Sequence, residues 1–178
     1  MAPDKLNEKL RVLLVDDEPD VLQTLEELLE DHHTTRAASF NEAKRLMDAQ
    51  TFDVAVLDIM GVDGYALLDI ANRKEIPAVM LTAHALSPEN TVKSFQKGAS
   101  FFVPKEKMSR IPSFIKDILD AKRKGEHSWS TWLKNFDTYY TQKFGPEWKE
   151  ENKEFWDAIE KLDWRLASAL RRKEENKS

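Results

Sequence analysis

Short runs of branched apolar residues alternate with amphipathic segments along residues 9–124, and this alternation limits the possible folds more than any other feature. The first run, at residues 12–15, contains no polar position, as expected of a strand that is buried on both faces. An acidic loop follows it. From Pro19 onward, apolar residues recur at spacings of three and four, which indicates a helix.

This unit of strand, loop and helix repeats along the chain. The pattern predicts an α/β fold with a five-stranded, parallel, doubly wound sheet that helices cover on both faces. Ligands bind such sheets at the carboxyl ends of the strands. The predicted strands after the first lie near residues 35–38 and at 54–58, 77–82 and 101–103, and the predicted helices after the first lie around 41–49, 64–70, 88–98 and 111–119.

The tryptophans mark a change in composition, because all five follow the run Lys122–Gly125. We therefore divide the chain into an N-terminal extension at residues 1–8, an α/β domain at 9–124 and a Trp-rich helical extension at 125–178. The tryptophans are Trp129, Trp132, Trp148, Trp156 and Trp164.

The extension is expected to be a helical hairpin that breaks at Gly145 and Pro146. Its second apolar stripe, from Phe155 to Ala169, has the spacing of a short coiled-coil seam. The hairpin is too short for an autonomous domain, so its apolar faces must pack on the α/β domain, on a second chain or on a partner. We favour a homodimer in which two hairpins form a four-helix cluster.

Composition narrows the function. The net charge of -5 and the near balance of acidic and basic residues after Lys124 argue against a DNA-binding output. The absence of cysteine excludes disulfides and thiolate zinc sites. No apolar stretch is long enough to cross a bilayer and the N-terminus is charged, so we expect a cytoplasmic protein without membrane contact.

Reactive and polar residues stand at the ends of four predicted strands: Asp16 with Asp17, then Asp58, Thr82 and Lys105. They are expected to converge on one edge of the sheet. Three neighbouring carboxylates repel one another, so a bound Mg²⁺ would explain how all three stay ionised. The lysine and the threonine hydroxyl can both bind anionic oxygens, so the set predicts a site for a phosphoryl group.

In this order the residues resemble the receiver domain of two-component response regulators, over residues 9–124. The resemblance is carried by Leu13–Glu18, Asp58, Leu81–Ala83 and Gly98–Lys105. It implies a flavodoxin-like fold and a phosphoryl group that Asp58 accepts from a histidine kinase or phosphotransfer protein in a Mg²⁺-dependent reaction.

The resemblance also assigns roles to individual residues. Thr82 and Lys105 would contact the phosphoryl oxygens, and Phe102 stands at the position of the family's switch aromatic. The implied magnesium ligands are Asp16, Asp17, Asp58 and the backbone carbonyl of Met60.

Two segments depart from the family's pattern. The loop from Asp58 to Gly64 is about two residues shorter than usual for its place between strand and helix, which weakens the assignment of Met60. Pro104 precedes Lys105, whereas most members have proline after the lysine, so we expect no cis peptide bond there.

Two functions remain open. In the first, the protein is a phosphorylation-controlled response regulator whose helical tail mediates dimerisation or partner binding. The alternative is a constitutive interaction or scaffold module built on a receiver fold. In neither case do we expect a turnover enzyme, because the implied chemistry is self-catalysed phosphoryl transfer followed by slow autodephosphorylation.

Overall fold

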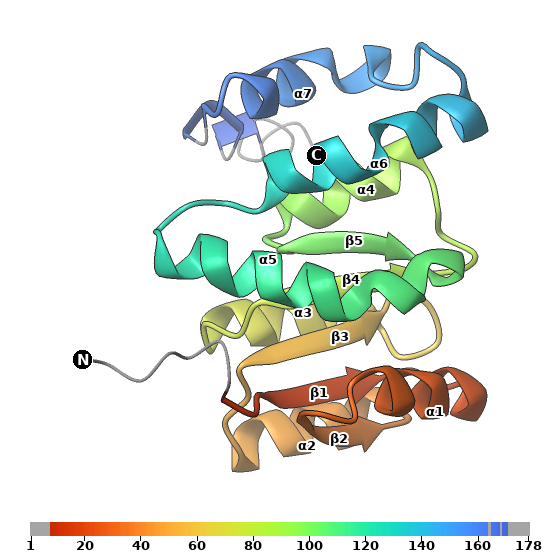
Figure 1. The fold of residues 1–178 in the computed structure, drawn as a ribbon, viewed down its shortest axis with the longest axis vertical. Helices are drawn as coiled ribbons and strands as arrows, with labels where there is room; N and C mark the ends of the chain where they lie inside the picture. The colour runs from red at the N-terminus through yellow and green to blue at the C-terminus, as the bar shows by residue number, and fades with distance from the viewer. Residues whose placement is uncertain (1–7, 164, 168, 171–178) are drawn as a thin grey trace.

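The predicted parallel sheet is confirmed in a computed structural model that describes residues 8–163, 165–167 and 169–170. Five parallel strands pair in the order β2-β1-β3-β4-β5, so β2 and β5 are the two edges (Figure 1). The fold class is the doubly wound α/β class predicted from the sequence. The strands are β1 (Arg11–Val15), β2 (His33–Ala37), β3 (Val54–Asp58), β4 (Ala78–Thr82) and β5 (Phe101–Pro104).

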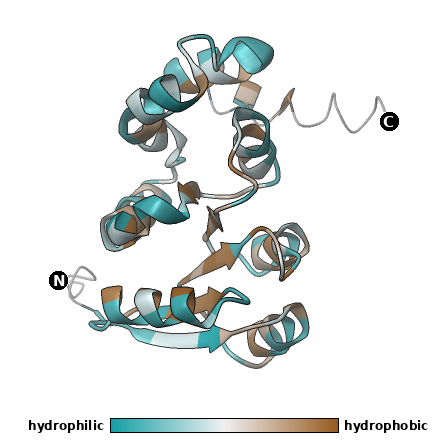
Figure 2. Cartoon of the chain, turned by 90° about the vertical axis from the view of Figure 1, so that its right-hand side faces the viewer, coloured by the Kyte–Doolittle hydropathy of each residue, from teal (hydrophilic) through white to brown (hydrophobic). Residues whose placement is uncertain are grey.

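Helices cover both faces of the sheet, and the strands between the two layers are hydrophobic except for the edge strand β2, which is largely hydrophilic (Figure 2). In Figure 1, α1 and α5 lie in front of the sheet and α2, α3 and α4 lie behind it. The helices are α1 (Pro19–Leu28), α2 (Phe40–Ala49), α3 (Gly64–Arg73), α4 (Pro88–Gln96) and α5 (Ile111–Arg123), and a 3₁₀ segment, η2 (Lys105–Arg110), leads into α5.

Local sequence signals set where these helices begin. The side chains of Ser39 and Ser87 cap α2 and α4 by accepting hydrogen bonds from the third residues of those helices. Pro19 and Pro88 fill first-turn positions, where the missing N–H costs nothing. Among the described residues, none of the helices combines the length and hydropathy needed to span a bilayer.

The extension adds α6 (Trp129–Phe144), η3 (Glu150–Asn152) and α7 (Lys153–Glu160), which stack beyond the β5 edge of the sheet (Figures 1 and 2). Helix α6 contacts β5 and α4. Of the three predicted ways to cover the aromatic faces, the described residues therefore show packing on the α/β domain of the same chain.

Side chains of the extension cover the open edge of β5. An edge strand carries unpaired carbonyl groups on its outer side. Here the Ser100 carbonyl accepts a hydrogen bond from the Ser128 hydroxyl at 2.6 Å, and the Phe102 carbonyl accepts one from the Trp132 indole N–H at 2.6 Å. Trp129 donates in the same way to the Ala99 carbonyl at 2.9 Å. These bonds thus occupy the Phe102 carbonyl of β5 and the carbonyls of the two residues just before the strand.

Aromatic packing joins the extension to α4. The ring of Phe95, which is buried on α4, lies at the centre of four aromatic side chains from the extension. These rings are buried too, so the hydrophobic core runs without interruption from the sheet into the extension. Their centroid distances from Phe95 are 5.5 Å for Trp129, 5.2 Å for Trp132, 6.4 Å for Phe155 and 6.4 Å for Trp156.

The predicted continuous seam from Phe155 to Ala169 is wrong. Helix α7 ends at Glu160, and Leu162 has a positive φ of 56°. The Asp163 N–H bonds back to the Ala158 carbonyl at 2.8 Å, a bond that closes a helix C-terminus, so local capping overrides the seven-residue spacing. As a result Leu162 and Leu166 are exposed, while Phe155 is buried. Trp164 lies outside the described residues.

We expect Trp132→Phe to lower the free energy of unfolding by about 1–3 kcal/mol, because it leaves the buried Phe102 carbonyl without its donor. Urea denaturation of the full chain measures this. Trp156→Phe is the matched control, since the Trp156 indole N–H is buried and has no hydrogen-bond partner among the described residues. An equal loss of stability in both variants would show that the bond to Phe102 contributes nothing.

Candidate functional site

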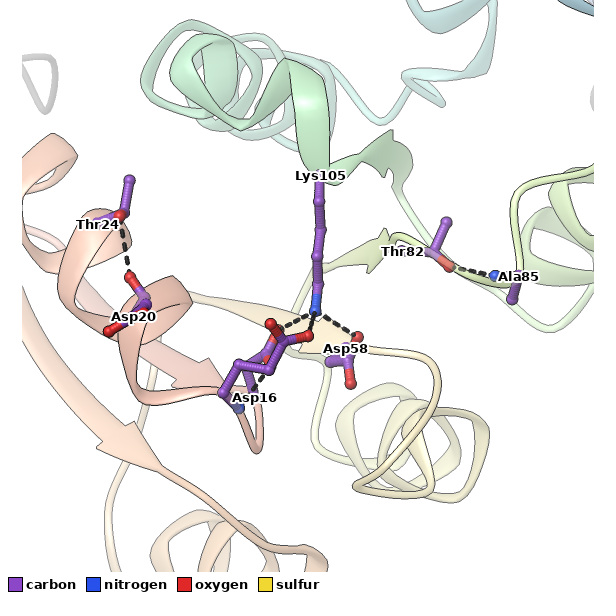
Figure 3. Close-up of polar contacts among 8 residues, drawn as sticks. Asp16, Asp20, Thr24, Asp58, Thr82, Ala85 and Lys105 are labelled. Carbon is purple, nitrogen blue, oxygen red and sulfur yellow. Dashed lines mark hydrogen bonds and ion pairs between the residues drawn. The ribbon is translucent and has the colours of Figure 1, made fainter.

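The ammonium group of Lys105 connects three carboxylates at the carboxyl edge of the sheet (Figure 3). Lys105 Nζ lies 2.9 Å from Asp16 Oδ2, 3.0 Å from Glu18 Oε1 and 3.3 Å from Asp58 Oδ1. Asp16 follows β1 and Asp58 ends β3, and these two strands are neighbours in the sheet. The structure therefore brings together Asp16, Asp58 and Lys105, which the sequence placed at one edge.

Burial controls the charge of this group. Burial, and next the negative charge of Asp16, raise the pKa of Asp58 to about 6. Burial likewise raises the pKa of Asp16 against the opposing effect of Lys105. Burial alone would lower the pKa of Lys105, but its close pairing with Asp16 and its hydrogen bond to Glu18 raise that pKa above its ordinary value. The lysine therefore stays charged and partly offsets the repulsion between the two aspartates.

Asp17 lies beside the short loop between β3 and α3. Gly61 in that loop has a φ of 82°, and a Cβ added to it would stand 2.6 Å from Asp17 Oδ2. A glycine at this position of the short loop therefore leaves room for the Asp17 carboxylate, which a side chain would crowd. Met60 lies in the same loop with its side chain 56% exposed. Its suggested role concerns only the backbone carbonyl and stays a prediction.

Thr82 and Phe102 lie apart from the Lys105 group. Thr82 is buried at the end of β4, and its hydroxyl accepts a hydrogen bond from the Ala85 N–H at 2.9 Å rather than facing Asp58 (Figure 3). Phe102 is fully buried in β5, and its carbonyl is the acceptor for Trp132. Within the described part of the chain, no hydrogen bond joins either residue to the carboxylates.

The donor set fits a hard divalent cation. Carboxylate oxygens of Asp16, Asp17 and Glu18 lie within 4.8 Å of one another. Oxygen donors of this kind suit Mg²⁺, and a cation would offset the charge that Lys105 leaves uncompensated. No role was predicted for Glu18 from the sequence, although its place directly after Asp16 and Asp17 was a usable signal. Asp58 lies beside this group, because Lys105 pairs with both Asp58 and Asp16.

Comparison with known families agrees with this geometry. The family model described as the response regulator receiver domain matches residues 12–116, more than half of the chain. The chain therefore belongs to the response regulator receiver family.

Individual relatives match a little over half of the chain. The two-component response regulator ARR18 of Arabidopsis thaliana is 32% identical over 108 residues, which are 57% of this chain and 17% of that protein. The heme response regulator HssR of Staphylococcus aureus (strain JH9) is 35% identical over 102 residues, 54% of this chain and 45% of that protein. The chain thus spans less than half the length of these curated relatives.

Among solved structures, the chain is similar to a CheY-like receiver domain protein from Methanospirillum hungatei JF-1. The TM-score is 0.60 and the identity 29%, over 66% of this chain and 99% of that one. The similarity therefore covers almost all of that receiver domain protein and about two-thirds of this chain.

We expect Gly61→Ala to weaken Mg²⁺ binding roughly tenfold, because the new methyl group would push the Asp17 carboxylate away from its neighbours. Calorimetric titration with Mg²⁺ measures this. Gly145→Ala is the control: Gly145 also has a positive φ, of 93°, but nothing lies within 4 Å of its added Cβ. Unchanged affinity in Gly61→Ala would mean that Asp17 takes no part in holding the metal.

We also expect Asp58→Asn to raise the free energy of unfolding of the metal-free protein at pH 7, by about 1–3 kcal/mol. The pKa of Asp58 is raised in the folded state, so the ionised form costs stability above pH 6. That cost disappears as the pH falls toward the ordinary value of 3.8. Urea denaturation in a chelator at several pH values tests this, and a gain that persists unchanged at low pH would contradict it.

Proposed function

We propose that the protein is a response regulator that accepts a phosphoryl group on Asp58 from a histidine kinase or a phosphotransfer protein. The observation that carries the proposal is the position of the Lys105 ammonium, 3.3 Å from Asp58 Oδ1 and bound at the same time to Asp16 and Glu18. A nucleophilic carboxylate and a fixed cation at one buried edge are what phosphoryl transfer requires.

The chemistry follows from these groups. An Asp58 carboxylate oxygen attacks the phosphorus of a phosphohistidine, an O–P bond forms, and the P–N bond breaks with its electron pair going to the imidazole. Lys105 is placed to bind a phosphoryl oxygen, and the Thr82 hydroxyl has a proton to donate to another. With a pKa of about 6, Asp58 is mostly ionised at pH 7 and available as the nucleophile.

Asp16, Asp17 and Glu18 would hold Mg²⁺, which would offset negative charge on the phosphoryl oxygens. Each transfer leaves an aspartyl phosphate on the protein itself, so we propose a phosphoprotein with slow self-catalysed hydrolysis and not a turnover enzyme.

We further propose that the protein acts in the cytoplasm, signals through protein contacts of its extension and does not bind DNA. The homodimer stays a prediction. The aromatic faces that suggested it are buried within the chain, so they no longer require a second chain to cover them. Leu162 and Leu166 are the large apolar side chains that the described part of the extension leaves exposed.

The alternative, a constitutive scaffold, is favoured by one observation. The core of the α/β domain continues into the extension, which suits a rigid module. The two functions differ in one observable. A regulator should change the conformation of its extension on phosphorylation, and a constitutive scaffold should not.

Acetyl phosphate with Mg²⁺ is expected to add one phosphoryl group to the full chain, and Asp58→Ala is expected to abolish the addition because it removes the nucleophile. Intact-mass measurement tests both. Asp48→Ala is the control, since Asp48 is an exposed aspartate that pairs with Lys74. Undiminished labelling of Asp58→Ala would refute the assignment.

A further inference from the structure

Two adjacent tyrosines of α6 contact the receiver domain next to residues of the proposed phosphoryl site. Tyr140 is fully buried, and its hydroxyl lies 2.6 Å from Thr91 Oγ1 on α4. The Tyr139 hydroxyl donates to the carboxylate of Glu106, the residue that follows Lys105. The extension therefore reaches both the helix that follows Thr82 and the segment that carries Lys105.

The contact of Tyr140 has a defined direction. Thr91 donates its single hydroxyl proton to the Ser87 carbonyl at 2.7 Å, so in the pair with Tyr140 its oxygen must accept. Tyr140 is thus the donor. Both hydroxyls are buried, and water cannot take the place of either partner.

Hydrogen bonds continue from Thr91 to Thr82 through the loop between β4 and α4. They tie the first turn of α4 to the loop and the loop to the Thr82 hydroxyl. The Asn90 N–H donates to Ser87 Oγ at 3.1 Å, Asn90 Nδ2 donates to the Ala85 carbonyl at 2.9 Å, and the Ala85 N–H donates to Thr82 Oγ1 at 2.9 Å.

We propose that Tyr140 is a positioning residue for Thr82, through which the extension holds the site in its unphosphorylated arrangement. This inference rests on the proposed function, in which the Thr82 hydroxyl binds a phosphoryl oxygen on Asp58. That hydroxyl now faces Ala85, and Thr82 is too deeply buried to be resolvated if it turns away.

A turn of Thr82 toward Asp58 therefore releases the Ala85 N–H and disturbs the line of bonds that ends at Tyr140. Docking of Tyr140 and binding of a phosphoryl group then oppose each other. By thermodynamic linkage, docking of Tyr140 weakens phosphoryl binding by the same factor as phosphoryl binding weakens docking of Tyr140. Removing the Tyr140 contact therefore removes this factor and strengthens phosphoryl binding.

The test uses the full chain, Mg²⁺ and beryllofluoride as the phosphoryl mimic. Tyr140→Phe removes only the donor hydroxyl, and we expect it to raise the affinity for beryllofluoride about fivefold. The affinity for Mg²⁺ alone should stay unchanged, which separates positioning of Thr82 from damage to the metal site. Asn90→Ala interrupts the same line at its middle and should act in the same direction, so the test does not depend on one variant folding well.

Tyr65→Phe is the matched control. Its hydroxyl lies 3.2 Å from Ser94 Oγ and 3.5 Å from the backbone carbonyl of Asn90, both on α4. No hydrogen bond between described residues joins it to Thr91 or to the Asn90 side chain that bonds to Ala85, and Tyr65 belongs to the receiver domain and not to the extension. The Tyr65→Phe variant therefore loses a tyrosine hydroxyl that bonds to the same helix, and we expect its affinity for beryllofluoride to stay unchanged.

Three outcomes would overturn the inference. If wild type binds beryllofluoride and Tyr140→Phe and Asn90→Ala bind it equally well, the coupling is wrong and the proposed function stands. If Tyr65→Phe gains as much affinity as Tyr140→Phe, the effect is a general loosening of α4 and Tyr140 has no special role. If the wild-type chain does not bind beryllofluoride with Mg²⁺, both the proposed function and the coupling are wrong.

Discussion

The ion pairs of one lysine allow two aspartates to be buried side by side. Asp16 is 0% and Asp58 4% exposed, and two carboxylates held this way are costly unless a cation compensates them. Lys105 provides that charge from the end of β5, although β4 stands between β5 and β3 in the sheet. The site is therefore sensitive to the position of an edge strand that pairs with only one neighbour.

The extension fixes that strand. The Trp132 indole ties α6 to β5 through the Phe102 carbonyl, and the Trp129 indole ties it to the Ala99 carbonyl just before that strand. The same indoles pack on Phe95 of α4, so one helix restrains both the strand that leads to Lys105 and the helix that follows Thr82. The tail is thus part of the structure that supports the site, even though the family model ends before it.

The sequence was sufficient for the features that depend on alternation and order. The five strands, and the meeting of Asp16, Asp58 and Lys105, follow from parallel strands that end at one edge. The sequence pattern was insufficient where the conformation of a loop or a helix cap determines the structure. The contact of Gly61 with Asp17 depends on a loop conformation that periodicity does not encode, and the end of α7 before Leu162 depends on a capping bond that competes with a plausible heptad. Apolar spacing showed which faces of the tail must be covered, but not by what.

Two free energies limit how the tail can respond: that of burying its aromatic side chains, and that of coupling between two sites in a protein. Burial of each large aromatic side chain stabilises by about 1.5–3 kcal/mol, so the four rings around Phe95 together contribute on the order of 10 kcal/mol. Coupling between two sites in a protein is typically about 1–3 kcal/mol. Under the proposed function, a phosphoryl group on Asp58 would therefore have enough free energy to exchange a hydroxyl bond such as the one at Tyr140, but not enough to detach the tail. We therefore expect any response of the extension to be a rearrangement in place, in which the aromatic cluster around Phe95 stays packed while the loop before α4 shifts.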